Sequence, residues 1–176
     1  MMVLIEKFLG RRLEIPEDRS YHVKQGLWAK QDESILTFGL SEPALILAGG
    51  LKDLDWLVTE GQAVQQGETV IFAITGKILY IDSPMKGEIH YNDEIKHAPE
   101  LVLSDPYHKG WLFKLTSWEE TEKDFHGLAH ASAYVESLKN SEGGKNPEGL
   151  KGGVSGMCKA VYSGIVAQKI KRLYSC

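Results

Sequence analysis

The stretch that decides the fold is Trp56–Tyr91, which reads WLVTEGQAVQQGETVIFAITGKILYIDSPMKGEIHY. Short runs rich in Val, Ile, Phe and Tyr alternate here with turns that contain Gly, Pro, Asp or Ser, a pattern typical of closely spaced β-strands. At its centre, Thr75-Gly76-Lys77-Ile78 lies between two apolar runs. Glycine at the first central position suits a two-residue type II′ hairpin, which would place Lys77 at an exposed tip.

The same alternation of apolar runs and turn residues continues on both sides of this stretch, so the sequence predicts a series of short strands. A helix is expected from Ser41, whose side chain would cap it, to Leu51. Runs this short and this evenly spaced indicate a small barrel or sandwich. The expected strands are Tyr21–Ala29, Ser34–Leu40, Leu54–Thr59, Gln62–Val64, Thr69–Ile74, Ile78–Ile81, Gly87–Tyr91 and Trp111–Leu115.

After Ser117 the apolar residues recur at roughly helical spacing, which predicts a helix from Ser117 to about Leu138. Ser141–Gly153 contains five glycines and one proline, so it is expected to be a flexible linker. Met157–Tyr174 can form a second amphipathic helix with basic residues near its end. This helix would dock on a partner or on the protein's own acidic body, or else it packs against the β domain or forms a mobile terminus.

Charge is distributed unevenly along the 176 residues, although 43% hydrophobic and 25% charged residues are ordinary values for a globular protein. Residues 1–149 carry 15 basic and 24 acidic residues, a net −9, whereas residues 150–176 carry five basic and no acidic ones, a net +5. An acidic body does not favour binding to nucleic acid. No apolar run approaches the length of about 18 residues that a membrane span needs.

Both cysteines, Cys158 and Cys176, lie in the basic C-terminal part, and the chain has no CxxC pair. Two cysteines placed there cannot cross-link the β domain, which indicates free thiols in a reducing compartment. We therefore expect a cytoplasmic protein.

Several sequence blocks resemble one known family, the glycine cleavage system H proteins, which are lipoyl carriers. Residues 105–112, DPYHKGWL, are close to the family's DPYGxGWL and are the most specific match. Glu60-Gly61 with Val64 and Gly67 fits the carrier pattern EGxxVxxG. The remaining blocks are Ile15-Pro16-Glu17-Asp18 with Tyr21, Phe38-Gly39-Leu40-Ser41 through Ala44, Ser83-Pro84 with Gly87-Glu88, Asn92, and Pro99-Glu100-Leu101. The resemblance runs from about Glu14 to Leu115.

This resemblance implies a mostly β fold of the lipoyl/biotinyl-carrier type, a barrel-sandwich hybrid, with C-terminal α-helices. It implies a carrier and not an enzyme, with lipoic acid joined by an amide to the lysine at the hairpin tip. Lys77 is the candidate attachment residue, flanked by Thr75, Gly76 and Ile78, and we assign no catalytic and no metal-binding residue.

The resemblance also implies a function and partners. In the family, the lipoyl-lysine arm shuttles an aminomethyl group from glycine decarboxylation between enzymes. These partners are a pyridoxal-phosphate glycine decarboxylase (P protein), an aminomethyltransferase (T protein) and dihydrolipoyl dehydrogenase (L protein). A lipoate ligase would attach the arm, and the pathway would be glycine cleavage or a related one-carbon or sulfur-transfer route.

The tip itself departs from the family pattern. The family has ESVKA, with an acidic residue three before the lysine, where this chain has Ile74. Pro84 and Gly87 follow Lys77 by seven and ten residues, and the family spacings are eight and eleven. Either the hairpin is one residue shorter and Lys77 still occupies the tip, or the attachment lysine is missing.

Other readings of the chain remain open. The first is an unlipoylated H-like protein that acts as a binding or adaptor module through its apolar tip and basic tail. A biotin carrier would have Met on both sides of the lysine, where this chain has Gly76 and Ile78. His126 and His130 could share a helix face and bind a metal, but no third ligand stands at a suitable spacing, so a solvated helix face is favoured. Ser104, Asp105 and His108 resemble a triad in sequence only.

These observations divide the chain into five parts. We expect residues 1–19 to be an N-terminal segment, 20–116 an H-protein-like lipoyl-carrier domain, 117–140 a helical extension, 141–153 a Gly-rich linker and 154–176 a basic C-terminal helix.

Overall fold

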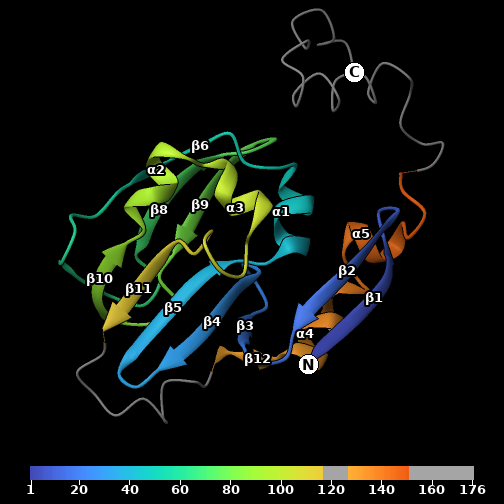
Figure 1. Ribbon diagram of the computed structural model, residues 1–176, viewed down its shortest axis with the longest axis horizontal. Coiled ribbons are helices and arrows are strands. Elements are labelled where there is room, and N and C mark those ends of the chain that lie inside the picture. The colour runs from blue at the N-terminus through green and yellow to red at the C-terminus, as the bar shows by residue number, and fades with distance from the viewer. Residues whose placement is uncertain (117–126, 151–176) are drawn as a thin grey trace, which may run out of the picture.

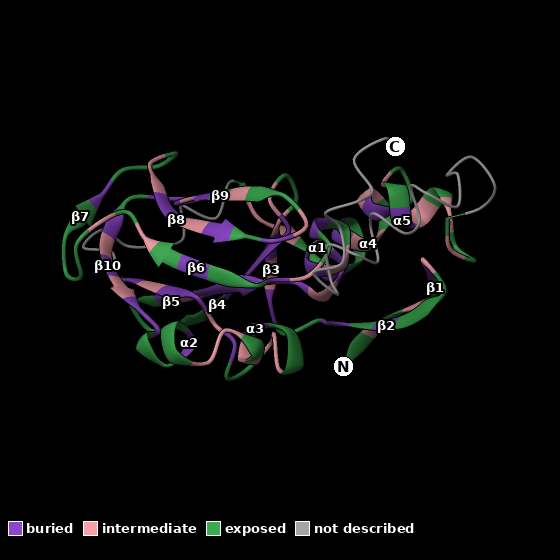
Figure 2. Cartoon of the chain, turned by 90° about the horizontal axis from the view of Figure 1, so that it is seen from above, coloured by how far each residue is buried: buried purple, intermediate pink, exposed green. Residues whose placement is uncertain are grey.

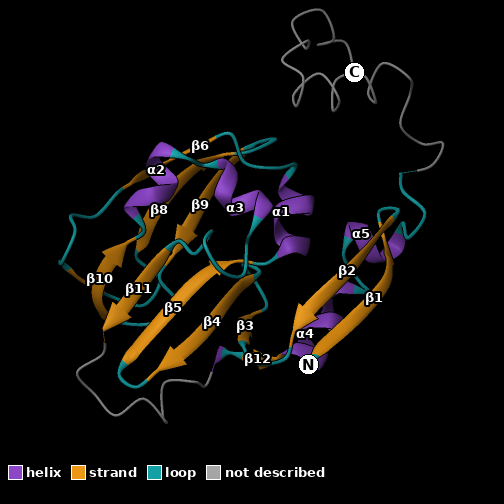
Figure 3. Ribbon diagram, in the orientation of Figure 1, coloured by secondary structure: helices purple, strands orange, loops and turns teal. Residues whose placement is uncertain are grey.

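The computed structural model describes residues 1–116 and 127–150, and short antiparallel strands predominate there (Figures 1 and 3). The strands are β1 (Met2–Phe8), β2 (Arg11–Pro16), β3 (Ser20–His22), β4 (Leu27–Asp32), β5 (Ile35–Leu40), β6 (Asp53–Trp56), β7 (Ala63–Val64), β8 (Thr69–Ile74), β9 (Ile78–Asp82), β10 (Gly87–Tyr91), β11 (Phe113–Thr116) and β12 (Ala129–His130). The helices are α1 (Glu42–Ala48), α2 (Asp93–His97), α3 (Glu100–Ser104), α4 (Ala131–Leu138) and α5 (Glu142–Lys145).

Two sheets enclose the main core. The larger has the order β12-β3-β4-β5-β11-β10-β7 and the smaller the order β6-β8-β9. Figure 2 shows the smaller sheet lying over the larger one. Phe38 and Phe113 of the larger sheet and Ile71 of the smaller are fully buried in one cluster. The mostly β fold expected from the sequence is confirmed, and β8 and β10 have the bounds that the sequence predicts.

Helix α1 begins and ends on residues that suit those positions. Ser41 caps its first turn, because its Oγ accepts a hydrogen bond from the N–H of Ala44 at 3.3 Å. Gly49 follows the last turn in the left-handed conformation, with φ of 81°, and its N–H bonds back to the carbonyl of Ile46. The cap predicted at Ser41 is confirmed, and the helix ends at Ala48, before the expected Leu51.

The N-terminal segment forms a hairpin that the sequence did not predict. Strands β1 and β2 pair antiparallel as a separate two-stranded sheet. Their apolar face joins a second core cluster with β3 and α4, in which Phe8, Leu13 and Ile15 are buried. In this cluster the rings of Tyr21 and Tyr134 stack with centroids 4.7 Å apart. The first residues of the chain are therefore part of the folded body.

The described part of the Gly-rich linker contains a helix, contrary to our expectation. Helix α5 occupies residues 142–145, and Ser141 caps it by accepting the N–H of Gly144. Gly143 is buried so closely against Phe8 that a Cβ there would lie 2.2 Å from the ring. Glycine serves here to let a helix approach an aromatic ring, so a flexible linker was the wrong interpretation of residues 141–150.

The helix expected from Ser117 is only partly described. Helix α4 covers residues 131–138, and the short strand β12 precedes it and pairs with β3. His130 therefore lies in a strand and not on the expected helix face. The cap at Ser117, the partner His126, both cysteines and the helix expected over residues 157–174 lie outside the described residues.

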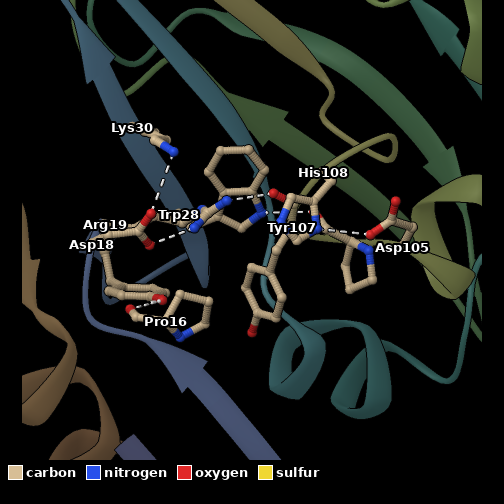
Figure 4. A network of polar contacts seen from close by, with 10 residues as sticks. Pro16, Asp18, Arg19, Trp28, Lys30, Asp105, Tyr107 and His108 are labelled. Carbon is tan, nitrogen blue, oxygen red and sulfur yellow. Dashed lines mark hydrogen bonds and ion pairs between the residues drawn. The ribbon is translucent and has the colours of Figure 1, made fainter. Parts of the chain in front are cut away.

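A polar network fastens the DPYHKGWL segment, residues 105–112, to the larger sheet (Figure 4). The buried Arg19 guanidinium contacts Asp18 and donates to the Tyr107 carbonyl, both at 2.5 Å, and lies 4.9 Å from the Trp28 ring centroid. The Trp28 indole donates to the carbonyl of Pro106 at 2.9 Å. Burial alone would raise the Asp18 pKa, but Arg19 and Lys30 hold it below its usual range. Residues 105–112, the most specific match to the family, thus help to hold this loop against the sheet.

No helix within residues 1–116 and 127–150 is long and apolar enough to cross a membrane.

We expect Gly143→Ala to destabilise the protein by about 1–3 kcal/mol, because the added methyl group overlaps the Phe8 ring and overpacks the second core. The measurement is the free energy of unfolding in urea. Gly127→Ala is the matched control, since a Cβ at Gly127 meets nothing within 4 Å. Equal stability of the two variants would contradict the packing of α5 on the hairpin.

We expect stability to fall at alkaline pH. Burial raises the pKa of Tyr134 to about 12, and the hydrogen bond with Ser41 partly offsets this effect. Because the folded-state pKa lies above the ordinary value, this stabilisation is complete below about pH 10 and is lost as the pH rises toward 12. Urea unfolding measured from about pH 8 to 11.5 should show the decline. In Tyr134→Phe the decline should be shallower, and an unchanged slope would contradict the assignment.

Candidate functional site

Lys77 lies in the loop between β8 and β9, and its side chain is exposed. Ile74 and Ile78 are the last paired residues, so the loop consists of Thr75, Gly76 and Lys77. The buried Thr75 ties the loop together: its N–H and hydroxyl donate to the Lys77 carbonyl at 2.8 and 2.7 Å, and its Oγ1 accepts the Lys77 N–H at 3.1 Å. The backbone of Lys77 is therefore fixed while its amine remains accessible.

The loop rests on the C-terminal end of α1. The N–H of Gly76 donates to the carbonyl of Ala48 at 2.9 Å, which satisfies one of the carbonyl groups that the end of a helix leaves open. A Cβ on Gly76 would lie 3.0 Å from that carbonyl oxygen, and a Cβ on Gly49 would lie 3.2 Å from the Gly76 Cα. Two glycines therefore permit this approach, and any larger residue would push the loop outward.

The type II′ turn predicted at Thr75-Gly76-Lys77-Ile78 is wrong. That turn requires a positive φ at Gly76, but Gly76 is not among the glycines that adopt one. The loop has three residues because Thr75 turns inward and bonds across it, and Gly76 is needed for the contact with α1. The sequence placed Lys77 in the loop correctly but misjudged the loop's geometry.

Two hollows flank α1 and meet the loop from opposite sides. A groove of about 360 Å³ is lined by Lys77 and Leu79, by residues 23–26 and by one face of α1. A hollow of about 570 Å³ lies against the other face of α1 and reaches Gly76. Of the two, only the smaller groove includes the Lys77 side chain, so it is the one next to the candidate attachment point.

Apolar side chains surround the exposed lysine. Ile78 and Tyr80 are each 58% exposed and Ile74 is 41% exposed, all on the outer face of the smaller sheet. Phe72 is paired with Tyr80, and their rings meet edge to face at 5.7 Å. Ile74, which replaces the family's acidic residue, thus belongs to an apolar face beside the tip.

The remaining candidates do not form a reactive site. Asp105 bonds to the His108 ring at 3.0 Å through one carboxylate oxygen and accepts the Lys109 N–H through the other, which folds the turn after α3. Within residues 1–116 and 127–150, no group of three His, Cys, Asp or Glu side chains could hold a metal ion. Sequence reasoning missed the role of α1 in supporting the lysine, although Gly49-Gly50 after an apolar helix was a signal for its end.

Comparisons with known proteins identify the family of this chain. Residues 19–141 match the family described as Glycine cleavage H-protein. The chain is 34% identical to a glycine cleavage system H protein of Enterobacter sp. (strain 638) over 128 residues, 72% of this chain and 97% of that protein. It is 34% identical to glycine cleavage system H protein 5 of Aquifex aeolicus (strain VF5) over 108 residues, 58% of this chain and 72% of that one.

A solved structure gives the same result. The crystal structure of a glycine cleavage system H protein from Mycobacterium marinum superposes with a TM-score of 0.59 at 25% sequence identity, covering 69% of this chain and 97% of that one. The match to the family begins at Arg19, after the hairpin of β1 and β2, and ends at Ser141. The chain therefore belongs to the glycine cleavage H-protein family, a family of carrier proteins and not of enzymes.

Proposed function

We propose that this protein is a lipoyl carrier whose arm is attached to Lys77 by an amide bond. The observation that carries the proposal is the position of Lys77 in the β8–β9 loop, with its side chain exposed, although the hairpin is one residue shorter than the family pattern. In this interpretation the hairpin has lost one residue and Lys77 still occupies the tip.

The residues around Lys77 fit such a group. A ligase must reach the amine, and the exposed side chain meets that condition. A carrier must also hold the base of the arm steady, and Thr75 and Gly76 do so through their bonds to Lys77 and Ala48. When bound, a lipoyl group supplies a dithiolane that carries a reactive group between enzymes. Tethering it to one folded body raises its effective concentration at each partner.

We infer the partners from the family. The arm would serve glycine cleavage by carrying an aminomethyl group between the P, T and L proteins, after a lipoate ligase has attached it. A cytoplasmic location follows from the absence of a CxxC pair and from the position of both cysteines outside the β domain.

One observation favours a second function, that of an unlipoylated adaptor. The family's polar tip is replaced by the exposed apolar residues Ile74, Ile78 and Tyr80. An apolar face beside an exposed lysine is typical of a surface that binds another protein. In this reading Lys77 remains a free amine, and the tip recognises a partner directly.

Intact mass separates the two functions. After co-expression with lipoate ligase and supply of lipoate, the full chain should gain about 188 Da, the mass of one lipoyl amide. Lys77→Arg should abolish the addition while the fold is unchanged by circular dichroism. Lys24→Arg, a lysine lining the same groove, is the matched control and should still be modified.

Two results would contradict the proposal. If wild type remains unmodified under conditions that modify an ordinary H protein, the adaptor function replaces the carrier function. If Lys77→Arg still gains the mass, the protein is a carrier but the attachment residue is another lysine.

Thr75→Val should slow the modification of Lys77 several-fold, because valine keeps the shape of threonine but removes both hydrogen bonds between Thr75 Oγ1 and Lys77. The measurement is the initial rate of lipoylation by purified ligase, with circular dichroism as the control for folding. Thr75→Ser, which retains the hydroxyl, should restore most of the rate. Equal rates for valine and serine would show that the loop bonds do not position the lysine.

A further inference from the structure

The strand that follows Lys77 has a free edge. In the smaller sheet β9 pairs with β8 on one side, and within the described residues no strand pairs with its other side. Figure 2 shows β9 at the outside of this sheet, with β8 and then β6 beyond it. Sheet edges are commonly protected by a proline, a bulge or a covering segment, because their unpaired backbone groups attract other strands. β9, with the sequence ILYID, contains no proline.

Hydrogen bonds at the end of β9 show which of its backbone groups face outward. The N–H and carbonyl of Asp82 bond to the side-chain amide of Gln25, at 2.8 and 3.0 Å, on the side away from β8. The N–H of the next residue, Ser83, donates to the carbonyl of Glu68, which precedes β8. Backbone groups alternate in direction along a strand. Those of Ile78 and Tyr80 therefore point outward with those of Asp82.

Gln25 thus occupies part of this edge as a neighbouring strand would. Its amide supplies one donor and one acceptor to Asp82, which is the pattern of one backbone unit in an antiparallel pair. Within residues 1–116 and 127–150, Gln25 closes the edge at Asp82 and no strand pairs with it at Ile78 and Tyr80, whose side chains are also exposed. An extended peptide would find two residues ready for pairing, beside an apolar surface.

The positive charge beside this edge favours acidic peptides over basic ones. The groove lined by Leu79 of β9 and by residues 23–26 has two lysines among its lining residues, Lys24 and Lys77. Among the described residues that line it there is no Asp or Glu. A strand added to β9 directs alternate side chains inward over this groove. Carboxylates on those side chains would be attracted to these cations, whereas lysines would be repelled.

We propose that β9 accepts an extended acidic segment of a partner protein as an added strand. The segment pairs with the outward backbone groups of Ile78 and Tyr80 and places a carboxylate near Lys24. Its outward side chains extend the apolar face formed by Phe72, Ile74, Ile78 and Tyr80. This docking does not depend on modification of Lys77, since Lys24 keeps its charge in either state.

Two other occupants fit less well. The chain's own C-terminal part, residues 150–176, has five basic and no acidic residues, so Lys24 and Lys77 would repel it. In an antiparallel pair of two β9 strands centred on Tyr80, Ile78 of one copy would face Asp82 of the other. The backbone groups of Asp82 are already bonded to Gln25, so that pairing would keep only the bonds between the two Tyr80 residues.

The test begins with a random linear heptapeptide library displayed on phage and selected against the full-length protein. The enriched peptides should be acidic with alternating apolar residues. The most enriched one is then synthesised, together with a version in which lysine replaces each acidic residue, and both affinities are measured. In amide hydrogen exchange, the acidic peptide should protect the N–H groups of Ile78 and Tyr80, which exchange quickly in the free protein.

Variants separate strand addition from simple apolar contact. Tyr80→Pro removes an outward N–H without disturbing the bonds to β8, and Tyr80→Val is its matched control because it keeps that N–H. Proline should weaken binding at least about fivefold relative to valine. Lys24→Glu should weaken the acidic peptide and not its lysine version, and Lys109→Glu, an exposed residue away from the groove, should change neither.

Several results would overturn the proposal. These are a selection without acidic preference, equal binding by the proline and valine variants, and no added protection at Ile78 and Tyr80. Dimerisation of the full chain that Tyr80→Pro abolishes would assign the edge to a second copy. Tighter peptide binding after removal of residues 151–176 would assign it to the chain's own tail.

Discussion

The contact between Gly76 and the end of α1 is the constraint on which the functional part of this molecule depends. One hydrogen bond, from the Gly76 N–H to the Ala48 carbonyl, joins the lysine loop to a helix that is itself fixed at both ends. The bond forms only because neither Gly76 nor Gly49 has a side chain to hold the two backbones apart. This bond and those between Thr75 and Lys77 fix the backbone of the three-residue loop, while the Lys77 side chain remains exposed.

The sequence predicted what depends on local pattern. The bounds of β8 and β10, the cap at Ser41 and the position of Lys77 between two apolar strands all follow from periodicity and turn residues. It failed where distant segments decide the structure. The hairpin of β1 and β2 has its packing partners in α4 and α5, more than a hundred residues away. Likewise, the sequence around Gly143 predicts a flexible segment, because its contact with Phe8 cannot be inferred from local sequence.

In the candidate site, too, local sequence predicts some features and distant contacts determine the others. Thr-Gly-Lys between two apolar strands predicts a tight turn. Here, however, the geometry of the loop depends on the hydrogen bond from Gly76 to Ala48, at the end of a helix some thirty residues earlier. The use of Gln25 as a partner for the edge of β9 could not be read from its position between Lys24 and Gly26 either. Long-range contacts of this kind allow the sequence of a family's loop to change while the fold is kept. The altered tip of this chain makes such contacts.

The N-terminal hairpin has a consequence for the order in which the chain can fold. Its turn is held by a bond from the Gly10 N–H to the Pro147 carbonyl and by the ion pair of Lys7 with Glu148. During synthesis the hairpin leaves the ribosome well before residues 147 and 148, and its last contacts become available only when those residues have followed. Until then Phe8 lacks Gly143, while all strands of the smaller sheet are already available to fold. The packing of the hairpin is therefore completed long after its own synthesis, and its apolar face needs protection from aggregation in the meantime.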